Sequence, residues 1–346
     1  MFVTHDVSLA ARTTLGLGGS ARRLLRVEAL GDLQEALALA AGEPVLVLGG
    51  GSNLVVRDGG FAGTVIEMAI PGVTITADGD TAIVSAFAGV EWDALVAQLV
   101  DAGLAGVESM SGIPGRVGAT PMQNVGAYGQ EVADTIELVR VLDRQTGEIE
   151  RFEPADCGFA YRTSVFKGSA QWIVVEVRFR LRRSTLSAPI RYPELARALG
   201  VAPGEGAPLA EVRRTVIELR RGKGMVVDAD DPDSRSAGSF FMNPIVDAPM
   251  LAAIEARVPA GVTMPTFPAP AGHTKLSAGW LIERAGFVKG TTRGRVGISS
   301  KHALALINRG GATTTELLAL AREIQDGVRA RFGVDLVPEP VIVGAD

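Results

Sequence analysis

Three consecutive glycines, Gly49 to Gly51, stand between two short runs of β-favouring aliphatic residues in "PVLVLGGGSNLVV" at residues 44–56. Because both flanks favour strands, the loop joins strand to strand, whereas the dinucleotide-binding loop of a doubly wound fold opens a helix. The sequence therefore argues against a Rossmann fold. Backbone N–H groups in such a loop can converge on a phosphate, and Ser52 and Asn53 add donors. For a lone glycine loop, however, a tight structural turn is the favoured interpretation.

Helical and strand-like segments alternate along the chain. Amphipathic spacing predicts helices over residues 32–41, 91–103, 209–221, 249–257, 277–286 and 314–331. The last helix has a capping box, Thr313 with Glu316, and Gly333 beyond its end. β-rich runs predict strands over residues 45–48, 54–56, 64–68, 73–76, 81–87, 135–142, 171–181 and 239–246. This mixture indicates the α+β class.

The length of 346 residues exceeds what one core usually supports, so we expect two domains. Periodicity is lost after residue 182, and the stretch to residue 208 is rich in glycine and proline, which places the boundary near residue 186. We predict domains over 1–186 and 187–332, followed by a C-terminal segment, 333–346.

Charge and cysteine usage exclude several classes. A net charge of −5 gives no pull toward nucleic acid or an anionic membrane. Because no apolar run approaches the ~18 residues of a membrane span and no leader pattern is visible, we expect a cytoplasmic protein. Cys157 is the only cysteine, and His5, His273 and His302 are scattered, so no metal site is expected.

A second glycine-rich stretch, "SGIPGRVGATPMQNVGAYGQ" at residues 111–130, is long and almost uncharged. Loops of this length are uncommon in compact domains unless they hold something. Small residues and backbone amides would suit a large, flat, hydrogen-bonding ligand. An ordered structural loop explains the stretch equally well.

Two further segments carry polar residues among apolar ones. Alternation in "FAYRTSVFK", residues 159–167, favours a half-buried strand. Ser239 lies in "SAGSFFMNP", residues 236–244, and because the local sequence offers no histidine to act as a base, acyl-transfer chemistry is disfavoured there.

Two charged segments each allow a structural explanation. "LRRGKGM", residues 219–225, is a basic cluster suited to a diphosphate or a carboxylate, although a solvated helix end has the same composition. "LVPEPV", residues 336–341, fixes the backbone of Glu339 between prolines, as an ordinary rigid tail would.

Taken together, seven stretches occur in an order that resembles the UDP-N-acetylenolpyruvoylglucosamine reductase (MurB) family, flavoenzymes of peptidoglycan precursor synthesis. They are "LGGGSN", "IPGRVGATPMQNVGAYG", "YRTSVFK", "AGSFFMNP", "KLSAGWLIERAGFVKG", "SSKHALALINRGGAT" and "VPEPVIVG". Seven ordered matches over nearly the whole chain are far more specific than one glycine loop.

The resemblance implies an FAD-binding domain of the p-cresol methylhydroxylase type, built from two α+β subdomains, over 1–186. It implies an α+β substrate domain over 187–332 and a segment, 333–346, that returns to the active site and the FAD domain. FAD is expected to be noncovalent, since neither glycine loop contains a histidine or cysteine tether. The implied FAD contacts are Gly49, Gly50, Gly51, Ser52, Asn53, Gly115, Gly118, Ala119, Thr120, Gln123, Asn124, Gly126, Ala127 and Tyr128.

The implied reaction is reduction of UDP-N-acetylglucosamine enolpyruvate to UDP-N-acetylmuramate. NADPH reduces FAD, hydride passes to the vinyl carbon, and the neighbouring carbon is protonated. By the resemblance, Arg162 holds the carboxylate and its growing negative charge, Ser239 supplies the proton, and Glu339 completes the polarising network.

The substrate contacts implied by the resemblance are Tyr161, Tyr192, Arg220, Lys223, Asn243 and His302. His302 stands where some members of the family carry glutamine, and an Asp-rich loop, 228–235, is longer than the family pattern. We expect a monomer. Two alternatives are another flavin oxidoreductase of the same fold acting on an alcohol or sugar, and a noncatalytic sugar-nucleotide binding protein.

Overall fold

The computed structural model describes residues 1–345 and shows two compact units, each assembled from segments far apart in the sequence. Unit 1 contains Met1–Val7, Ala21–Gly51 and Ala62–Gly222. Unit 2 contains Ser8–Ser20, Ser52–Phe61 and the chain from Lys223 onward.

This division differs from the predicted boundary near residue 186, because residues 187–222 lie in unit 1. The later helix packs into this unit, since Leu209 is buried in the same core as Trp92, and an ion pair between Arg213 and Asp93, with 2.5 Å between Nη1 and Oδ1, adds a second link. The predicted functional division of the chain stays a prediction.

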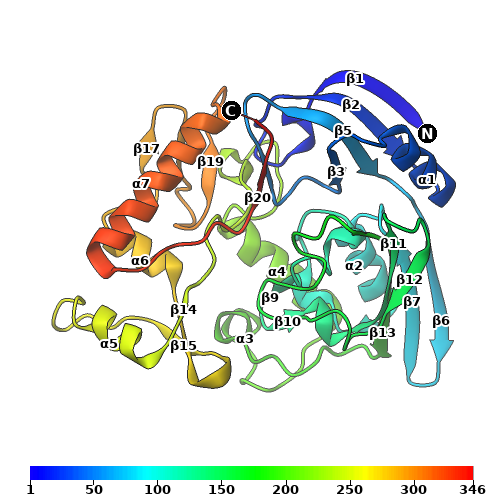
Figure 1. The fold of residues 1–346 in the computed structure, drawn as a ribbon. Coiled ribbons are helices and arrows are strands. Elements are labelled where there is room, and N and C mark those ends of the chain that lie inside the picture. Colours follow the sequence, from blue (N-terminus) through cyan, green and yellow to red (C-terminus); the bar gives the residue numbers. More distant parts are fainter. Residues whose placement is uncertain (346) are drawn as a thin grey trace. The chain divides into compact units, whose positions relative to one another are not determined.

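Seven α-helices lie in the described residues (Figure 1). They are α1 Leu30–Leu39, α2 Trp92–Asp101, α3 Pro193–Leu199 and α4 Leu209–Gly222 in unit 1, and α5 Ala248–Glu255, α6 Ala278–Arg284 and α7 Thr314–Phe332 in unit 2. The six predicted helices are all present, with ends that differ by at most two residues from those expected. Helix α3 was not predicted, because it lies within the glycine- and proline-rich stretch.

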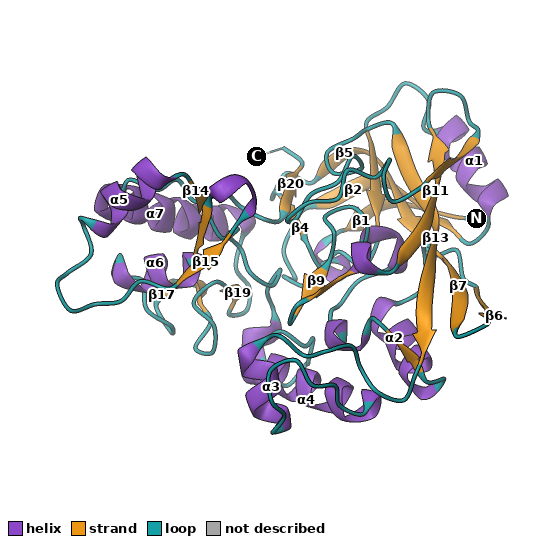
Figure 2. Cartoon of the chain, turned by 90° about the horizontal axis from the view of Figure 1, so that it is seen from below, coloured by secondary structure: helices purple, strands orange, loops and turns teal. Residues whose placement is uncertain are grey.

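Two sheets form most of unit 1. The first has strand order β1-β2-β5-β3, from Phe2–Ser8, Ser20–Val27, Phe61–Met68 and Val45–Leu48. The second has order β12-β11-β13-β7-β6, from Ile149–Phe152, Ile136–Asp143, Trp172–Arg183, Thr81–Phe87 and Val73–Asp78, with β8, Leu104–Ala105, beside β13. Figure 2 shows its long strands β11, β13 and β7 running alongside one another.

Helix α2 covers this second sheet as its spacing predicts. Trp92, Leu95, Val96 and Leu99 are buried and pack in one core with sheet residues such as Val177. Residues four apart on a helix share a face, so the apolar repeat becomes a buried stripe. The small antiparallel pair β9, Gly126–Ala127, and β10, Gln130–Glu131, lies in the long glycine-rich stretch.

Unit 2 contains three small sheets. They are β14-β16-β15, from Ile245–Val246, Thr274–Leu276 and Thr266–Pro268; β17-β18-β19, from Thr292–Arg293, Val296–Ile298 and Leu306–Asn308; and the parallel pair β4, Leu54–Val56, with β20, Val341–Val343. The C-terminal strand therefore pairs with a strand that directly follows the first glycine loop.

Helix α7 contributes its apolar face to the core of unit 2. Thr313 and Glu316 make the predicted capping box, and Gly333 ends the helix in the left-handed region with φ of 73°. Five residues of the predicted apolar face are buried there: Leu317, Leu320, Ala321, Ile324 and Val328.

Two strand predictions are wrong in whole or part. Residues 159–167 form turns, because Ala160 bridges Thr163 and Arg162 adopts φ of 54°, which a strand does not allow. In 239–246 only Ile245–Val246 is a strand, although Phe241 bridges Pro338. By contrast, the glycine loop does join two strands, β3 and β4, as expected.

Candidate functional site

The two glycine-rich stretches meet within unit 1. A Cβ atom on Gly50 would lie 2.7 Å from the Cα of Gly115, so only glycine permits this approach. A Cβ on Gly49 would instead sit 3.7 Å from the side chains of Arg116 and Ala119, which is ordinary contact. Gly50 is therefore required by the protein, whereas the space beside Gly49 is not filled by it.

The first loop also presents backbone donors. Among residues 1–345, the N–H groups of Gly50 and Gly51 donate to no protein acceptor. Gly51 is buried and has φ of 61°. Successive N–H groups in a turn with such backbone angles form an anion-binding concavity.

Backbone hydrogen bonds join the first half of the long stretch 111–130 to residues 88–92. The N–H of Gly118 donates to the carbonyl of Ala88 at 3.0 Å, and the N–H of Trp92 donates to the carbonyl of Gly115 at 3.1 Å. A Cβ on Gly118 would lie 2.5 Å from the Cβ of Ala88. Gly118 is thus explained by protein packing alone.

The second half of the stretch is fixed by Asn124. Its Nδ2 donates to Glu131 at 2.7 Å, and its Oδ1 accepts from the N–H of Ala133 at 3.1 Å. Its backbone has φ of 46°. A Cβ on Gly126 would meet the carbonyl oxygen of Gln130 at 2.6 Å. Both residues hold the loop in shape, whatever else they contact.

The other predicted cofactor residues of this stretch differ in exposure. Thr120 is buried, and its hydroxyl donates to the carbonyl of Val117 at 2.8 Å. Ala119 is exposed, while Gln123, Ala127 and Tyr128 are half-buried. The Thr120 hydroxyl therefore stabilises the short helical turn Val117–Ala119 that precedes it.

Arg162 lies against the same stretch. Its Nη2 donates to the carbonyl of Gly126 at 2.8 Å and its Nη1 to the carbonyl of Asn124 at 3.3 Å. Its guanidinium stands 5.6 Å from the ring centroid of Tyr161, and its own carbonyl accepts from Lys167 Nζ at 2.9 Å. The cation is fixed in place by the protein.

Arg220 is not the solvated helix end that composition allowed, since it is only 9% exposed. Burial lowers its pKa, and Tyr128 and Asp93 oppose that shift while Arg162 adds to it. The ring of Tyr128 meets that of Tyr192 edge to face at 5.3 Å. Burial raises the pKa of Tyr128 to about 12. Unit 1 thus holds a buried cation beside two tyrosines.

Unit 2 brings the predicted Ser239 and Glu339 onto neighbouring chain segments. The N–H of Glu339 donates to the carbonyl of Phe240 at 2.9 Å. Ser239 Oγ lies 3.5 Å from His302 Nε2, and Asn53 Nδ2 donates to the carbonyl of Glu339 at 3.4 Å. Residues distant in sequence thus lie on neighbouring segments, and His302 contacts the Ser239 hydroxyl itself.

The remaining predicted residues of unit 2 are half-buried: Ser52, Lys223 and Asn243. Asn243 Oδ1 accepts from the N–H of Ala278 at 2.9 Å, so its side chain caps the start of α6.

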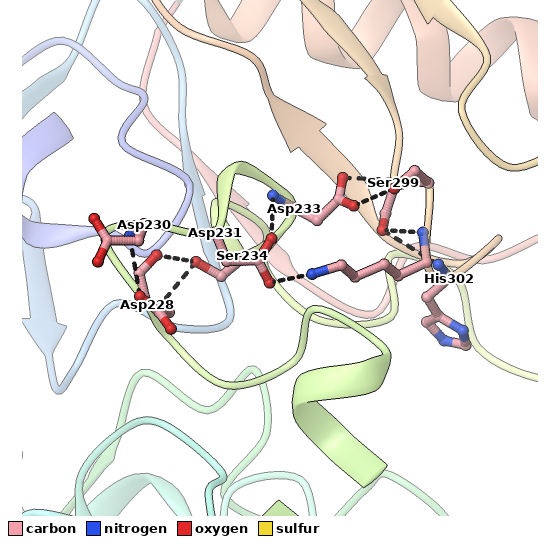
Figure 3. Close-up of polar contacts among 9 residues, drawn as sticks. Asp228, Asp230, Asp231, Asp233, Ser234, Ser299 and His302 are labelled. Carbon is pink, nitrogen blue, oxygen red and sulfur yellow. Dashed lines mark hydrogen bonds and ion pairs between the residues drawn. The ribbon is translucent and has the colours of Figure 1, made fainter. Parts of the chain in front are cut away.

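The sequence did not identify the contacts of the Asp-rich loop. Asp233 accepts from Ser300 twice, at 2.5 Å from the hydroxyl and 3.2 Å from the N–H (Figure 3). Asp231 pairs with Lys301 Nζ at 2.8 Å. The partners are about 70 residues apart, so no local signal revealed them.

Within residues 1–345, no helix is both long and apolar enough to cross a membrane. The same residues contain no group of three or more histidine, cysteine, aspartate or glutamate side chains arranged to hold a metal ion.

Comparison with known proteins gives the family. Residues 230–343 match the model of the UDP-N-acetylenolpyruvoylglucosamine reductase C-terminal domain, and residues 21–153 match that of an FAD binding domain. A UDP-N-acetylenolpyruvoylglucosamine reductase of Thermobifida fusca is 56% identical over 98% of both chains. The chain belongs to the UDP-N-acetylenolpyruvoylglucosamine reductase family. The resemblance found in the seven stretches is confirmed.

Other members agree with this assignment. The reductase of Saccharopolyspora erythraea is 53% identical, over 98% of this chain and 95% of the relative. The crystal structure of the reductase from Thermus caldophilus superposes with a TM-score of 0.68 at 29% identity and covers 99% of both chains. The predicted fold class, an FAD-binding domain of the p-cresol methylhydroxylase type with a C-terminal domain of this family, is confirmed.

FAD is the cofactor that the matched domain implies, and the residues present fit it. The matched range, 21–153, contains both glycine-rich stretches. The pyrophosphate of FAD needs backbone donors with little steric obstruction. The N–H groups of Gly50 and Gly51 are available as such donors, and a Cβ on Gly49 would meet the protein only at ordinary contact distance, so these residues would be suited to hold the pyrophosphate.

Proposed function

We propose that this chain reduces UDP-N-acetylglucosamine enolpyruvate to UDP-N-acetylmuramate, with NADPH as the reductant. Reductase activity in peptidoglycan precursor synthesis follows from the family to which the chain belongs. The observation that carries the finer proposal is the convergence of Ser239, His302 and Glu339 in a chain that also holds a glycine cradle. When bound, FAD takes hydride from NADPH and passes it to the vinyl carbon of the substrate.

Arg162 holds the substrate carboxylate. Two backbone carbonyls orient its guanidinium, so the positive charge need not reorganise when negative charge grows on the enolate. A guanidinium also suits a carboxylate because its N–H donors match the two oxygens in one plane.

Ser239 supplies the proton. Its Oγ–H bond breaks as a C–H bond forms at the carbon next to the hydride acceptor, and the oxygen regains a proton from water after turnover. The N–H of Glu339 donates to the carbonyl of Phe240, the residue after Ser239, and the Glu339 carboxylate polarises the proton-donating network.

The nucleoside diphosphate part of the substrate is bound by the basic residues Arg220 and Lys223 with Tyr192. Asn243 and Tyr161 orient the sugar end. A buried arginine suits a diphosphate, because a charge-assisted hydrogen bond is stronger where water is excluded.

FAD is held without a covalent bond. Histidine and cysteine are absent from residues 49–53 and 111–130. The single cysteine, Cys157, is buried, and burial raises the pKa of its thiol to about 12. A thiol so protonated is a poor nucleophile.

The proposed reaction predicts a colour cycle in the purified protein. It is expected to be yellow, to bleach when NADPH is added without oxygen, and to regain its colour when the enolpyruvyl substrate follows. Anaerobic absorbance spectroscopy checks each step. Colour restored by oxygen but not by the substrate would favour an oxidase of the same fold, and a colourless protein that binds UDP-sugars would favour the noncatalytic alternative.

The cradle predicts a specific effect of Gly49→Ala. The added methyl group has only ordinary contacts with the protein, at 3.7 Å, so the fold should be unaffected. Crowding a tightly packed ligand costs about 1–3 kcal/mol, hence we expect FAD affinity to fall roughly tenfold to a hundredfold. Fluorescence titration of FAD into apoprotein measures the affinity, and thermal melting of the apoprotein checks the fold.

Gly50→Ala and Gly31→Ala are the matched controls. The first places a Cβ 2.7 Å from the backbone of Gly115, so both FAD binding and apoprotein stability should fall. The second adds a methyl group on α1 that meets nothing within 4 Å, so FAD affinity should not change and apoprotein stability should not fall. Wild-type FAD affinity in Gly49→Ala would place the pyrophosphate elsewhere.

A further inference from the structure

The Asp-rich loop, 228–235, is an ordered structure. The hydroxyl of Ser234 donates to the carbonyl of Asp228 at 2.7 Å and accepts from its N–H at 3.1 Å. Asp231 caps the short helical turn η5, Pro232–Ser234, by accepting from the N–H of Asp233. These bonds fix the direction of Asp233, whose side chain is buried with the residue only 6% exposed.

Asp233 anchors a turn formed by residues 299–302. The carboxylate accepts both the N–H and the hydroxyl of Ser300. Inside the turn, Ser299 is fully buried, and its Oγ accepts from the N–H groups of Lys301 at 3.0 Å and His302 at 3.2 Å (Figure 3). The backbone of His302 therefore has a fixed position relative to the loop.

The anchored turn holds the segment that carries Ser239 at two points. His302 Nε2 lies 3.5 Å from Ser239 Oγ. Two residues after His302, the carbonyl of Leu304 accepts from the N–H of Phe240 at 2.7 Å. The turn thus constrains both the side chain of Ser239 and the main chain next to it.

We infer that Asp233 and His302 are positioning residues for proton transfer from Ser239. This inference rests on the proposed role of Ser239 as proton donor. Asp233 holds the turn, and His302 donates its Nε2–H to Ser239 Oγ. The hydroxyl proton then points away from the histidine and toward the substrate, and the same donor stabilises the charge that develops on the oxygen as its proton leaves.

The neighbouring Asp231 provides a contrast on the same loop. Its partner Lys301 is 38% exposed at the side chain, and exposed ion pairs contribute little to holding a structure. The contact of Asp233 with Ser300 is charge-assisted and uses a carboxylate that is itself buried, so it is the stronger of the two although Ser300 is exposed.

The test separates the two half-reactions in the holoenzyme by stopped-flow spectroscopy. Asp233→Ala and His302→Leu are expected to slow reoxidation by the enolpyruvyl substrate on the order of 10- to 100-fold, as small misplacements of reacting groups do. Bleaching by NADPH should stay at the wild-type rate. The solvent deuterium isotope effect on reoxidation should rise, because proton transfer becomes more rate-limiting.

Two further variants serve as rescue and control. His302→Gln keeps an N–H donor at the end of the side chain. Its reoxidation by the substrate should therefore be at least tenfold faster than that of His302→Leu. Asp231→Asn should leave both half-reactions and the isotope effect unchanged. A purely structural role would slow both half-reactions in Asp233→Ala and would leave the isotope effect as it was, which would overturn the inference.

Other results also overturn it. If His302→Leu weakens substrate binding but reoxidises normally at saturation, His302 is a substrate contact, as the family resemblance implied. If both variants reoxidise normally while Ser239→Ala does not, the inference fails and the role of Ser239 stands. If Ser239→Ala itself reoxidises normally, the proposed proton donor fails, and the inference with it.

Discussion

Replacing Ser239 by alanine is expected to slow reoxidation by the enolpyruvyl substrate by roughly 10²- to 10⁴-fold, the usual contribution of a general acid. Bleaching by NADPH should proceed at nearly the wild-type rate. The change removes one hydroxyl whose contact is with His302, and it leaves the donors of Gly50 and Gly51 as they are. The two half-reactions should therefore separate.

Stopped-flow absorbance under anaerobic conditions measures both rates. Ser184→Ala is a suitable control, because the hydroxyl of Ser184 bonds only to exposed backbone nearby. Wild-type reoxidation in Ser239→Ala would mean that another group protonates the substrate. A fall in both rates together would point to a damaged FAD site instead.

Arg162→Lys should produce the second large effect, a fall of about 10²- to 10³-fold in reoxidation, comparable with loss of one preorganised donor. A lysine keeps the positive charge but presents a single ammonium group. That group cannot donate to the carbonyls of Asn124 and Gly126 and also form two coplanar hydrogen bonds with a carboxylate. Lysine tolerates the positive φ of this position no worse than arginine, so the backbone should stay as it is.

The matched control is Arg180→Lys, on an exposed arginine that pairs with Asp78 and Glu137. Substrate affinity should be measured beside the rate. If Arg162→Lys weakens substrate binding but is reoxidised at the normal rate by saturating substrate, Arg162 stabilises the bound substrate and the transition state equally.

Elements with a strong local signal were predictable. Helix α7 combines a capping box, an apolar face and a terminal glycine, all three of which agree with the tertiary structure. Helix α3 has end signals, Pro193 at its start and Gly200 just beyond its end, but its seven residues lie within a glycine- and proline-rich segment that reads as a loop.

The turn around Arg162 shows what local patterns miss. Alternating aromatic and polar residues in 159–167 favour a strand, but the bonds from Arg162 to Asn124 and Gly126 favour a turn. Those partners lie more than 35 residues away, so tertiary contacts overrode a short-range preference.

The residue types of the candidate site and their order along the chain could be predicted from the sequence. The structural reason for each residue could not. Composition could not separate Gly118, where a Cβ would clash with Ala88, from Gly49, where a Cβ would meet the protein only at ordinary contact distance. The contact of Asp233 with Ser300 joins positions 67 apart, and nothing in either local segment indicates that the two residues meet.

The pairing of β4 with β20 bears on how the chain is made. Residues 54–56 are synthesised long before their partners, residues 341–343, because the two strands start 287 residues apart (341 − 54). At about 5–20 residues per second, β4 waits roughly 15–60 s for its partner. Asp58, next to β4, must wait similarly for Thr314, whose N–H it accepts at 2.8 Å.

During that interval the nascent chain carries an aliphatic strand with unsatisfied backbone groups, which other chains can pair with. Once the last strand is in place, all three residues of β4 are buried. The exposure of β4 is therefore confined to synthesis and folding, and a chaperone that shields residues 54–56 would act before β20 is made.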